Sequence, residues 1–162
     1  MSAKPIPDGY DAFTPYLVVR NASKAIDFYK ELFGATELMR MPSPDGKSVM
    51  HAELKIRNSV IMLADENPQM NVFAPDPSGK PPPVSVMWYA PDVDAIFKKA
   101  VSMGAKGIMP PMDMFWGDRF CKFADPFGHH WGIATHQKDL SPADMAKAGQ
   151  EWAQQQARPK PA

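Results

Sequence analysis

Hydrophobic and polar positions in the first half of this chain follow a definite order of strand and helix patterns. Residues 13–20 are rich in β-branched and aromatic side chains, which is typical of a strand. Residues 21–34 then carry apolar side chains at helical spacing and end at Gly34, a residue type that often ends helices. Three strand patterns follow, and the middle one, residues 48–56, alternates between apolar and polar positions. The first half therefore predicts a strand, a helix and three more strands.

The same order returns in the second half. Residues 84–90 and 129–136 have strand character, and the helix pattern between them begins at Asp92 or Asp94 and ends at Gly104. The two halves are offset by about 70 residues, and a repeat of that length indicates two copies of one structural unit. We therefore expect an α+β chain with two βαβββ modules.

Proline-rich and polar segments mark the boundaries of these modules. The chain has 18 prolines, and six of them lie in residues 66–83, a segment typical of a linker or of a lid over a cavity. We expect five parts in chain order: a flexible N-terminal arm over 1–12, a first βαβββ module over 13–66, a proline-rich linker over 67–83, a second module over 84–137, and a C-terminal helix and tail over 138–162.

Composition and charge exclude several classes of function. Lys plus Arg and Asp plus Glu both number 18 in the 162 residues, so no broad basic surface for nucleic acid is expected. The one cysteine, Cys121, permits neither an intrachain disulfide nor a thiolate zinc site. No segment resembles a secretory signal or is apolar enough to span a membrane. We expect a cytoplasmic protein without nucleic-acid or membrane partners.

Several runs of residues are similar to one known family. The chain resembles the vicinal oxygen chelate superfamily, which includes glyoxalases, bleomycin resistance proteins and dioxygenases. The runs that carry the resemblance are VVRNASKAIDFYKELFGA, APDVDAIFKKAVSMGA and FADPFGHHWGIATH. Its PhnB-like branch is resembled most by MHAELKI and MFWGDRF. The resemblance implies the glyoxalase/bleomycin resistance/dioxygenase fold, in which the tandem modules form a curved open barrel. It also implies a homodimer and a concave cavity for a small-molecule ligand.

The same resemblance marks four positions where many members hold a divalent metal with His, Gln or Glu. In this chain those positions are Thr14, Met62, Ser85 and Gly132, and none has a usual metal-ligating side chain. We therefore expect the cavity without the family metal site, and no cofactor.

A displaced metal site is the alternative. His51 and Glu53 lie two residues apart on one strand and share a face, and His130 belongs to a face of the last strand. If the two faces meet, these three residues could bind zinc, nickel, iron or manganese. The competing interpretation is that His51 and Glu53 belong to a solvated strand face.

Six residues are our candidates for lining the ligand cavity. Aromatic walls and adaptable methionines suit a flat, aromatic ligand, and Arg119 offers a planar fork of donors to an anionic group, although an ion pair with a neighbouring strand would also account for it. The candidates are Tyr16, His51, Met62, Trp116, Arg119 and His130.

Three hypotheses about function remain. The first is a PhnB-like protein that binds a small molecule without a metal, the second is a metal-dependent glyoxalase-like lyase, isomerase or dioxygenase, and the third is a non-catalytic structural or interaction protein. The sequence has no G-x-G-x-x-G, Walker A or G-x-S-x-G motif, so dinucleotide binding, nucleotide-phosphate binding and serine hydrolysis are not indicated. Whether the protein is an enzyme stays open at this point.

Overall fold

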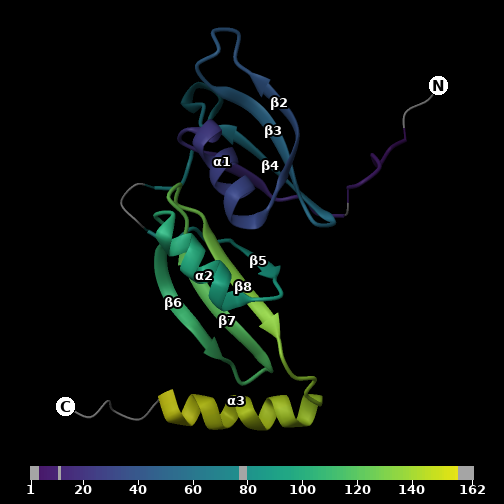
Figure 1. Cartoon of the computed structure of the whole chain (residues 1–162), viewed down its shortest axis with the longest axis vertical. Helices are drawn as coiled ribbons and strands as arrows, with labels where there is room; N and C mark the ends of the chain where they lie inside the picture. Colours follow the sequence, from purple (N-terminus) through teal and green to yellow (C-terminus); the bar gives the residue numbers. More distant parts are fainter. Residues whose placement is uncertain (1–3, 11, 77–79, 157–162) are drawn as a thin grey trace.

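The computed structural model describes residues 4–10, 12–76 and 80–156 and contains two modules with the same order of elements (Figure 1). The first module consists of β1 (Tyr16–Val19), α1 (Ala22–Phe33), β2 (Thr36–Pro42), β3 (Val49–Ile56) and β4 (Ser59–Asp65). The second module consists of β5 (Ser85–Tyr89), α2 (Val93–Ser102), β6 (Lys106–Asp113), β7 (Asp118–Ala124) and β8 (His130–His136). Outside the modules lie the short 3-10 helix η1 (Pro68–Met70) and the C-terminal helix α3 (Pro142–Gln156).

Each module forms its own four-stranded sheet. The strand orders are β1-β4-β3-β2 and β5-β8-β7-β6, and the first strand of each module runs parallel to its last. A parallel pair needs a crossover connection, and the rest of the module, including its helix, supplies it. The prediction of an α+β chain with tandem βαβββ modules is confirmed. The two sheets are curved but do not close into one barrel.

Side-chain caps begin the helices of both modules. Asn21 accepts a hydrogen bond from the backbone N–H of Lys24 at 3.1 Å, and Asp92 accepts one from Ala95 at 2.9 Å. Each bond satisfies one of the backbone donors that the first helical turn leaves free. Asp92 is therefore the cap of α2, and Asp94 lies in its first turn with its carboxylate available for another partner.

The two helices pack against the same side of the molecule. Helix α1 covers one face of the first sheet, α2 covers one face of the second, and the helices contact each other where the modules meet (Figure 1). Buried aromatic side chains join the modules there: the rings of Phe33 on α1 and Trp131 on β8 lie 4.6 Å apart. No helix of the described residues covers the opposite face of either sheet, and we call that face the open face of its module.

Helix α3 lies across the far end of the second module, away from the first (Figure 1). It packs through Trp152, whose ring is 5.6 Å from that of Phe115 in the β6–β7 connection. In the described part of the chain, no helix is long and apolar enough to cross a membrane.

Candidate functional site

The open face of the first module carries a row of hydrogen-bonded polar side chains. The hydroxyl of Tyr16 lies 3.1 Å from Nδ1 of His51, and Nε2 of His51 lies 3.1 Å from a carboxylate oxygen of Glu53. Tyr10, from the segment before β1, donates its hydroxyl to the other oxygen of Glu53, and this bond is the main cause that lowers the pKa of Glu53. Met62 pairs with both Tyr16 and Glu53 in the sheet, so the structure brings three of the six expected lining residues together.

Gly132, the position on the last strand where the resemblance implies a metal ligand, is closely packed. A side chain at Gly132 would place its Cβ 2.9 Å from Cε2 of Phe120 and 3.0 Å from Sδ of Met87. These two apolar side chains therefore fill the space where a ligating side chain would begin. The other three positions offer only the hydroxyls of Thr14 and Ser85 and the thioether of Met62, a poor donor set for a divalent cation.

The alternative metal set is only partly assembled. His51 and Glu53 are hydrogen-bonded neighbours, but His130 lies on the second module. Within residues 4–10, 12–76 and 80–156, no group of three or more His, Cys, Asp and Glu side chains could hold a metal ion. His130 instead lines a cavity of about 410 Å³ with Lys106 and Lys122. Burial, and then the charge of Lys122, lower the pKa of His130.

The open face of the second module has its own polar centre, the buried carboxylate of Asp118. It accepts hydrogen bonds from the Tyr89 hydroxyl at 2.9 Å, from Nε1 of Trp116 at 3.0 Å and from Nδ1 of His136 at 2.7 Å. Nε2 of His136 lies 3.0 Å from Asp139. The hydrogen bonds to Asp118 and Asp139 raise the pKa of His136. Because both imidazole nitrogens face carboxylates, which only accept, the charged imidazole is the form that satisfies both bonds.

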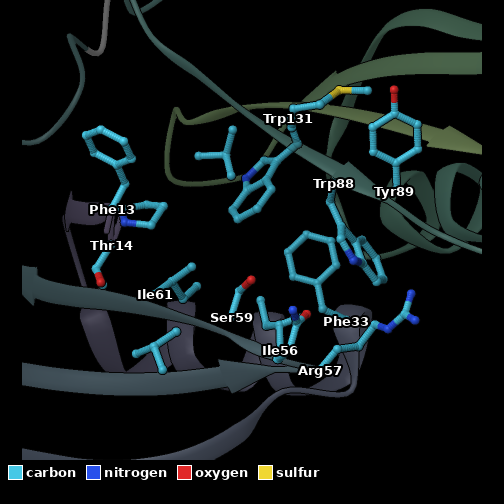
Figure 2. A pocket seen from close by; sticks show the side chains of 15 residues that line it. Phe13, Thr14, Phe33, Ile56, Arg57, Ser59, Ile61, Trp88, Tyr89 and Trp131 are labelled. Atoms are coloured by element: carbon cyan, nitrogen blue, oxygen red, sulfur yellow. The ribbon is translucent and has the colours of Figure 1, made fainter. Parts of the chain in front are cut away.

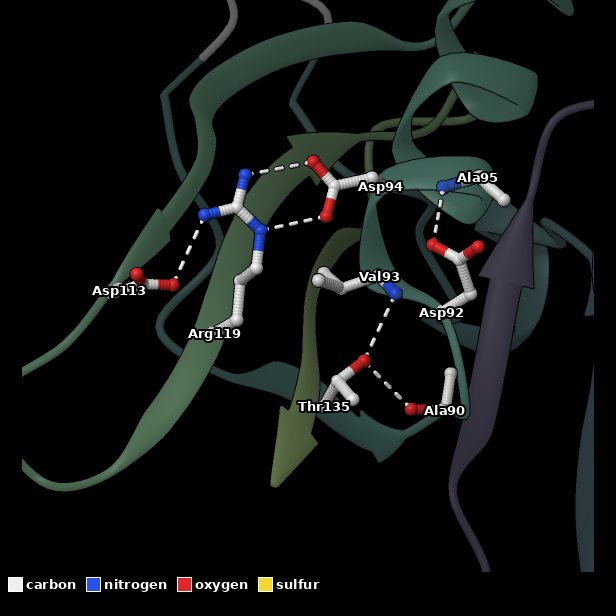
Figure 3. A network of polar contacts seen from close by, with 8 residues as sticks. All are labelled: Ala90, Asp92, Val93, Asp94, Ala95, Asp113, Arg119 and Thr135. Atoms are coloured by element: carbon white, nitrogen blue, oxygen red, sulfur yellow. Dashed lines mark hydrogen bonds and ion pairs between the residues drawn. The ribbon is translucent and has the colours of Figure 1, made fainter. Parts of the chain in front are cut away.

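Arg119 is not brought to this face. On β7 it alternates with Asp118 and Phe120, so its side chain lies on the side that α2 covers. Its guanidinium binds both carboxylate oxygens of Asp94, at 2.6 and 2.8 Å, and one of Asp113 at 3.0 Å (Figure 3). The expectation that Arg119 lines the same cavity as the other candidates is not met, and the ion-pair alternative describes its environment.

A cavity of about 500 Å³ lies between the two modules (Figure 2). Aromatic side chains from both modules line it: Phe13, Phe33, Trp88, Tyr89 and Trp131. None of the six residues expected to line the ligand cavity belongs to it. Sequence analysis missed this cavity because its walls come from segments whose relative position depends on how the modules pack.

Comparisons with known proteins identify the family. The pattern that defines the Glyoxalase/Bleomycin resistance protein/Dioxygenase superfamily matches residues 10–133. The chain belongs to this superfamily. The resemblance stated from the sequence is thereby confirmed.

The proteins that resemble this chain differ in what their names say. An uncharacterized protein of Mycobacterium tuberculosis is 41% identical over 140 residues, which cover 85% of this chain and 81% of that protein. The anthracycline biosynthesis protein DnrV of Streptomyces peucetius is 30% identical over 116 residues, which cover 70% of this chain and 42% of DnrV. The solved structure of a PhnB protein from Bacillus cereus superposes with a TM-score of 0.62 at 19% identity and covers 77% of this chain and 99% of that one. This likeness shows the fold alone.

Proposed function

We propose that this protein is a metal-free, small-molecule-binding member of the superfamily whose ligand lies against the open faces of the sheets. The observation that carries the proposal is the filled position at Gly132, where Phe120 and Met87 occupy the space of a family metal ligand. An apolar floor at that point favours contact with an apolar ligand over coordination of an ion. The hydroxyl of Tyr16 and the imidazole of His51, on the open face of the first module, can orient a ligand oxygen or nitrogen by hydrogen bonding.

The composition of the open faces supports an aromatic ligand. Tyr16, Met87 and Tyr89 are half exposed on them, at 50%, 47% and 53%. Aromatic rings and methionines adapt to flat apolar molecules. The similarity to DnrV, which is named for anthracycline biosynthesis, is consistent with such a ligand, because anthracyclines are planar aromatic compounds.

We further propose that the protein acts as a homodimer in the cytoplasm. The two open faces point to the same side of the chain, because the helices share the other side (Figure 1). A second copy related by a two-fold axis would place the first module of one chain opposite the second module of the other. This arrangement would cover the exposed Met41 and Met112 and would enclose a ligand between two curved sheets.

Ligand binding is tested by titrating the purified full-length protein with the anthracycline daunorubicin and following its fluorescence. We expect saturable binding that Met62→Lys weakens at least tenfold, because the substitution places a charge on the open face of the first module. Met145→Lys is the control, since it makes the same change at an exposed methionine on α3, away from the open faces. Binding that both variants retain would show that the ligand does not lie on the open face.

The dimer is tested by light scattering on the same preparation. We expect twice the mass of one chain, which is 18.0 kDa. Met41→Glu on the open face should shift the protein toward the monomer, and Met145→Glu should not. A monomer at all concentrations would contradict the homodimer.

The metal-dependent alternative is favoured by one observation, the contact between His51 and Glu53. Elemental analysis after incubation with zinc, nickel, iron(II) and manganese decides between the two candidates. We expect no stoichiometric metal. About one ion per chain, lost in His51→Ala, would overturn the metal-free proposal and favour lyase, isomerase or dioxygenase chemistry.

A further inference from the structure

We propose that the cavity between the modules is a second binding site, for a small aromatic anion such as an aryl carboxylate or sulfonate. The site lies between the modules, and its aromatic wall and its charge come from different segments (Figure 2). It adjoins the open face of the second module, because Met87 and Tyr89 line it as well. Three features carry the inference: the aromatic wall, the position of Arg57, and the backbone conformation of Arg57.

The wall suits a flat apolar body. Phe33 at the end of α1 packs edge-on against Trp88 of β5, with ring centroids 5.2 Å apart, and against Trp131 of β8 at 4.6 Å. Phe33 and Trp131 are almost fully buried, at 7% and 1% exposure, and form the fixed back of the wall. Tyr89, which is 53% exposed, offers the surface that a ligand can contact. A volume of about 500 Å³ lies within the range of sites for small molecules.

Arg57 supplies the charge that selects an anion. It lies in the turn between β3 and β4 and lines the same cavity as Phe33 and Trp88 (Figure 2). Among the described residues, no carboxylate pairs with its guanidinium, whereas Arg20, Arg40 and Arg119 each bind a neighbouring carboxylate. The lining also contains no Asp or Glu. An anionic group on the ligand could therefore form an ion pair with the guanidinium of Arg57.

The backbone of Arg57 has a conformation that a residue with a side chain does not favour. Its φ is 55°, in the left-handed region where an L side chain is disfavoured and glycine is not. A glycine would suit this tight turn better, and a residue held in such a conformation at the edge of a cavity is a recognised sign of function. The same feature provides a clean test, because Arg57→Gly removes the charge without harming the turn.

Two fluorescent probes of matched shape separate charge from apolar contact. Anilinonaphthalene sulfonate has the fused aromatic body and one negative charge, and N-phenylnaphthylamine has the same body without the charge. We expect the wild-type protein to bind the sulfonate about tenfold more tightly than the neutral amine, the ratio that one charge-assisted contact typically gives.

Three variants locate the site. Arg57→Gly should lower the affinity for the sulfonate about tenfold, leave the neutral amine unchanged, and unfold at the same urea concentration as the wild type or a higher one. Arg57→Lys should restore part of the preference, and Lys98→Gln, which removes an exposed charge on α2, should change nothing. Ser59→Trp should weaken both probes, because Ser59 points into the cavity (Figure 2).

Two results would overturn the inference. One is an unchanged preference for the sulfonate in Arg57→Gly. The other is binding of both probes that Met62→Lys abolishes and Ser59→Trp does not affect, which would place them on the open face. That second result would contradict the second binding site but not the proposed function. A protein that binds the sulfonate but not daunorubicin would contradict the proposed ligand of the open faces but not the second binding site.

Discussion

The hydroxyl of Tyr29 on α1 donates a hydrogen bond of 2.6 Å to the buried carboxylate of Asp125, which belongs to the other module. Nε1 of Trp131 donates to the same oxygen at 2.8 Å, and the backbone N–H groups of Phe127 and His129 donate to the other oxygen. Burial, followed by the charge of Asp125, raises the pKa of Tyr29 well above its ordinary value, so the phenol keeps its proton. Polar contacts in the core thus help to set how the modules sit.

We expect Tyr29→Phe to lower the free energy of unfolding by about 1–2 kcal/mol, because it leaves a buried carboxylate with one donor fewer. Urea denaturation followed by tryptophan fluorescence measures the change. Tyr16→Phe is the matched control, since Tyr16 is half exposed on the open face. Equal losses of unfolding free energy in the two variants would show that the buried hydrogen bond of Tyr29 stabilises the protein no more than the exposed one of Tyr16.

Gly132→Ala should destabilise the protein by about 0.5–1.5 kcal/mol, because its Cβ would push the side-chain ends of Phe120 and Met87 away from their preferred rotamers. The double variant Gly132→Ala with Phe120→Ala should lose less free energy of unfolding than the two single variants lose together, since Phe120→Ala opens the space that the alanine at position 132 needs. Denaturation of the two single variants and the double variant measures this coupling. Strict additivity would contradict the packing described for this position.

The charged form of His136 should persist at a pH where an ordinary histidine has lost its proton. Its pKa is raised, so the stabilisation from its bonds to Asp118 and Asp139 is fully present below the unfolded value of about 6.5 and disappears as the pH rises through the folded value. NMR titration of the imidazole protons measures the pKa. Asp139→Asn should lower that pKa but leave it above the ordinary value, because the bond to Asp118 is the larger cause. An unchanged pKa in this variant would contradict the assignment.

Cys121 should be unreactive in the folded protein. The side chain is fully buried, and burial raises the pKa of its thiol to about 11, so the nucleophilic thiolate is scarce near neutral pH. Iodoacetamide at pH 8 should label it at a negligible rate in buffer and rapidly in urea. Fast labelling of the native protein would point instead to local opening of β7.

The sequence was informative about features that depend on near neighbours. The alternation over residues 48–56 predicts which side chains share a face, and His51 and Glu53 indeed lie together on the open face. Placing Arg119 was less successful, because a pattern along one strand shows which residues alternate but does not show which face a helix will cover. Asp113 faces Arg119 across the β6–β7 hairpin, but Asp94 binds Arg119 only because α2 packs beside β7.

By itself, the sequence determined the two modules and the order of their helices and strands, because both follow from residue type and local spacing. Only the tertiary structure decided which residues of one module meet those of the other. Tyr29 and Asp125 are 96 residues apart, and Arg57 shares a cavity with Trp88 across the module boundary. Such encounters arise from the packing of two preformed units, and that packing is settled by the fit of whole surfaces, which no local pattern records.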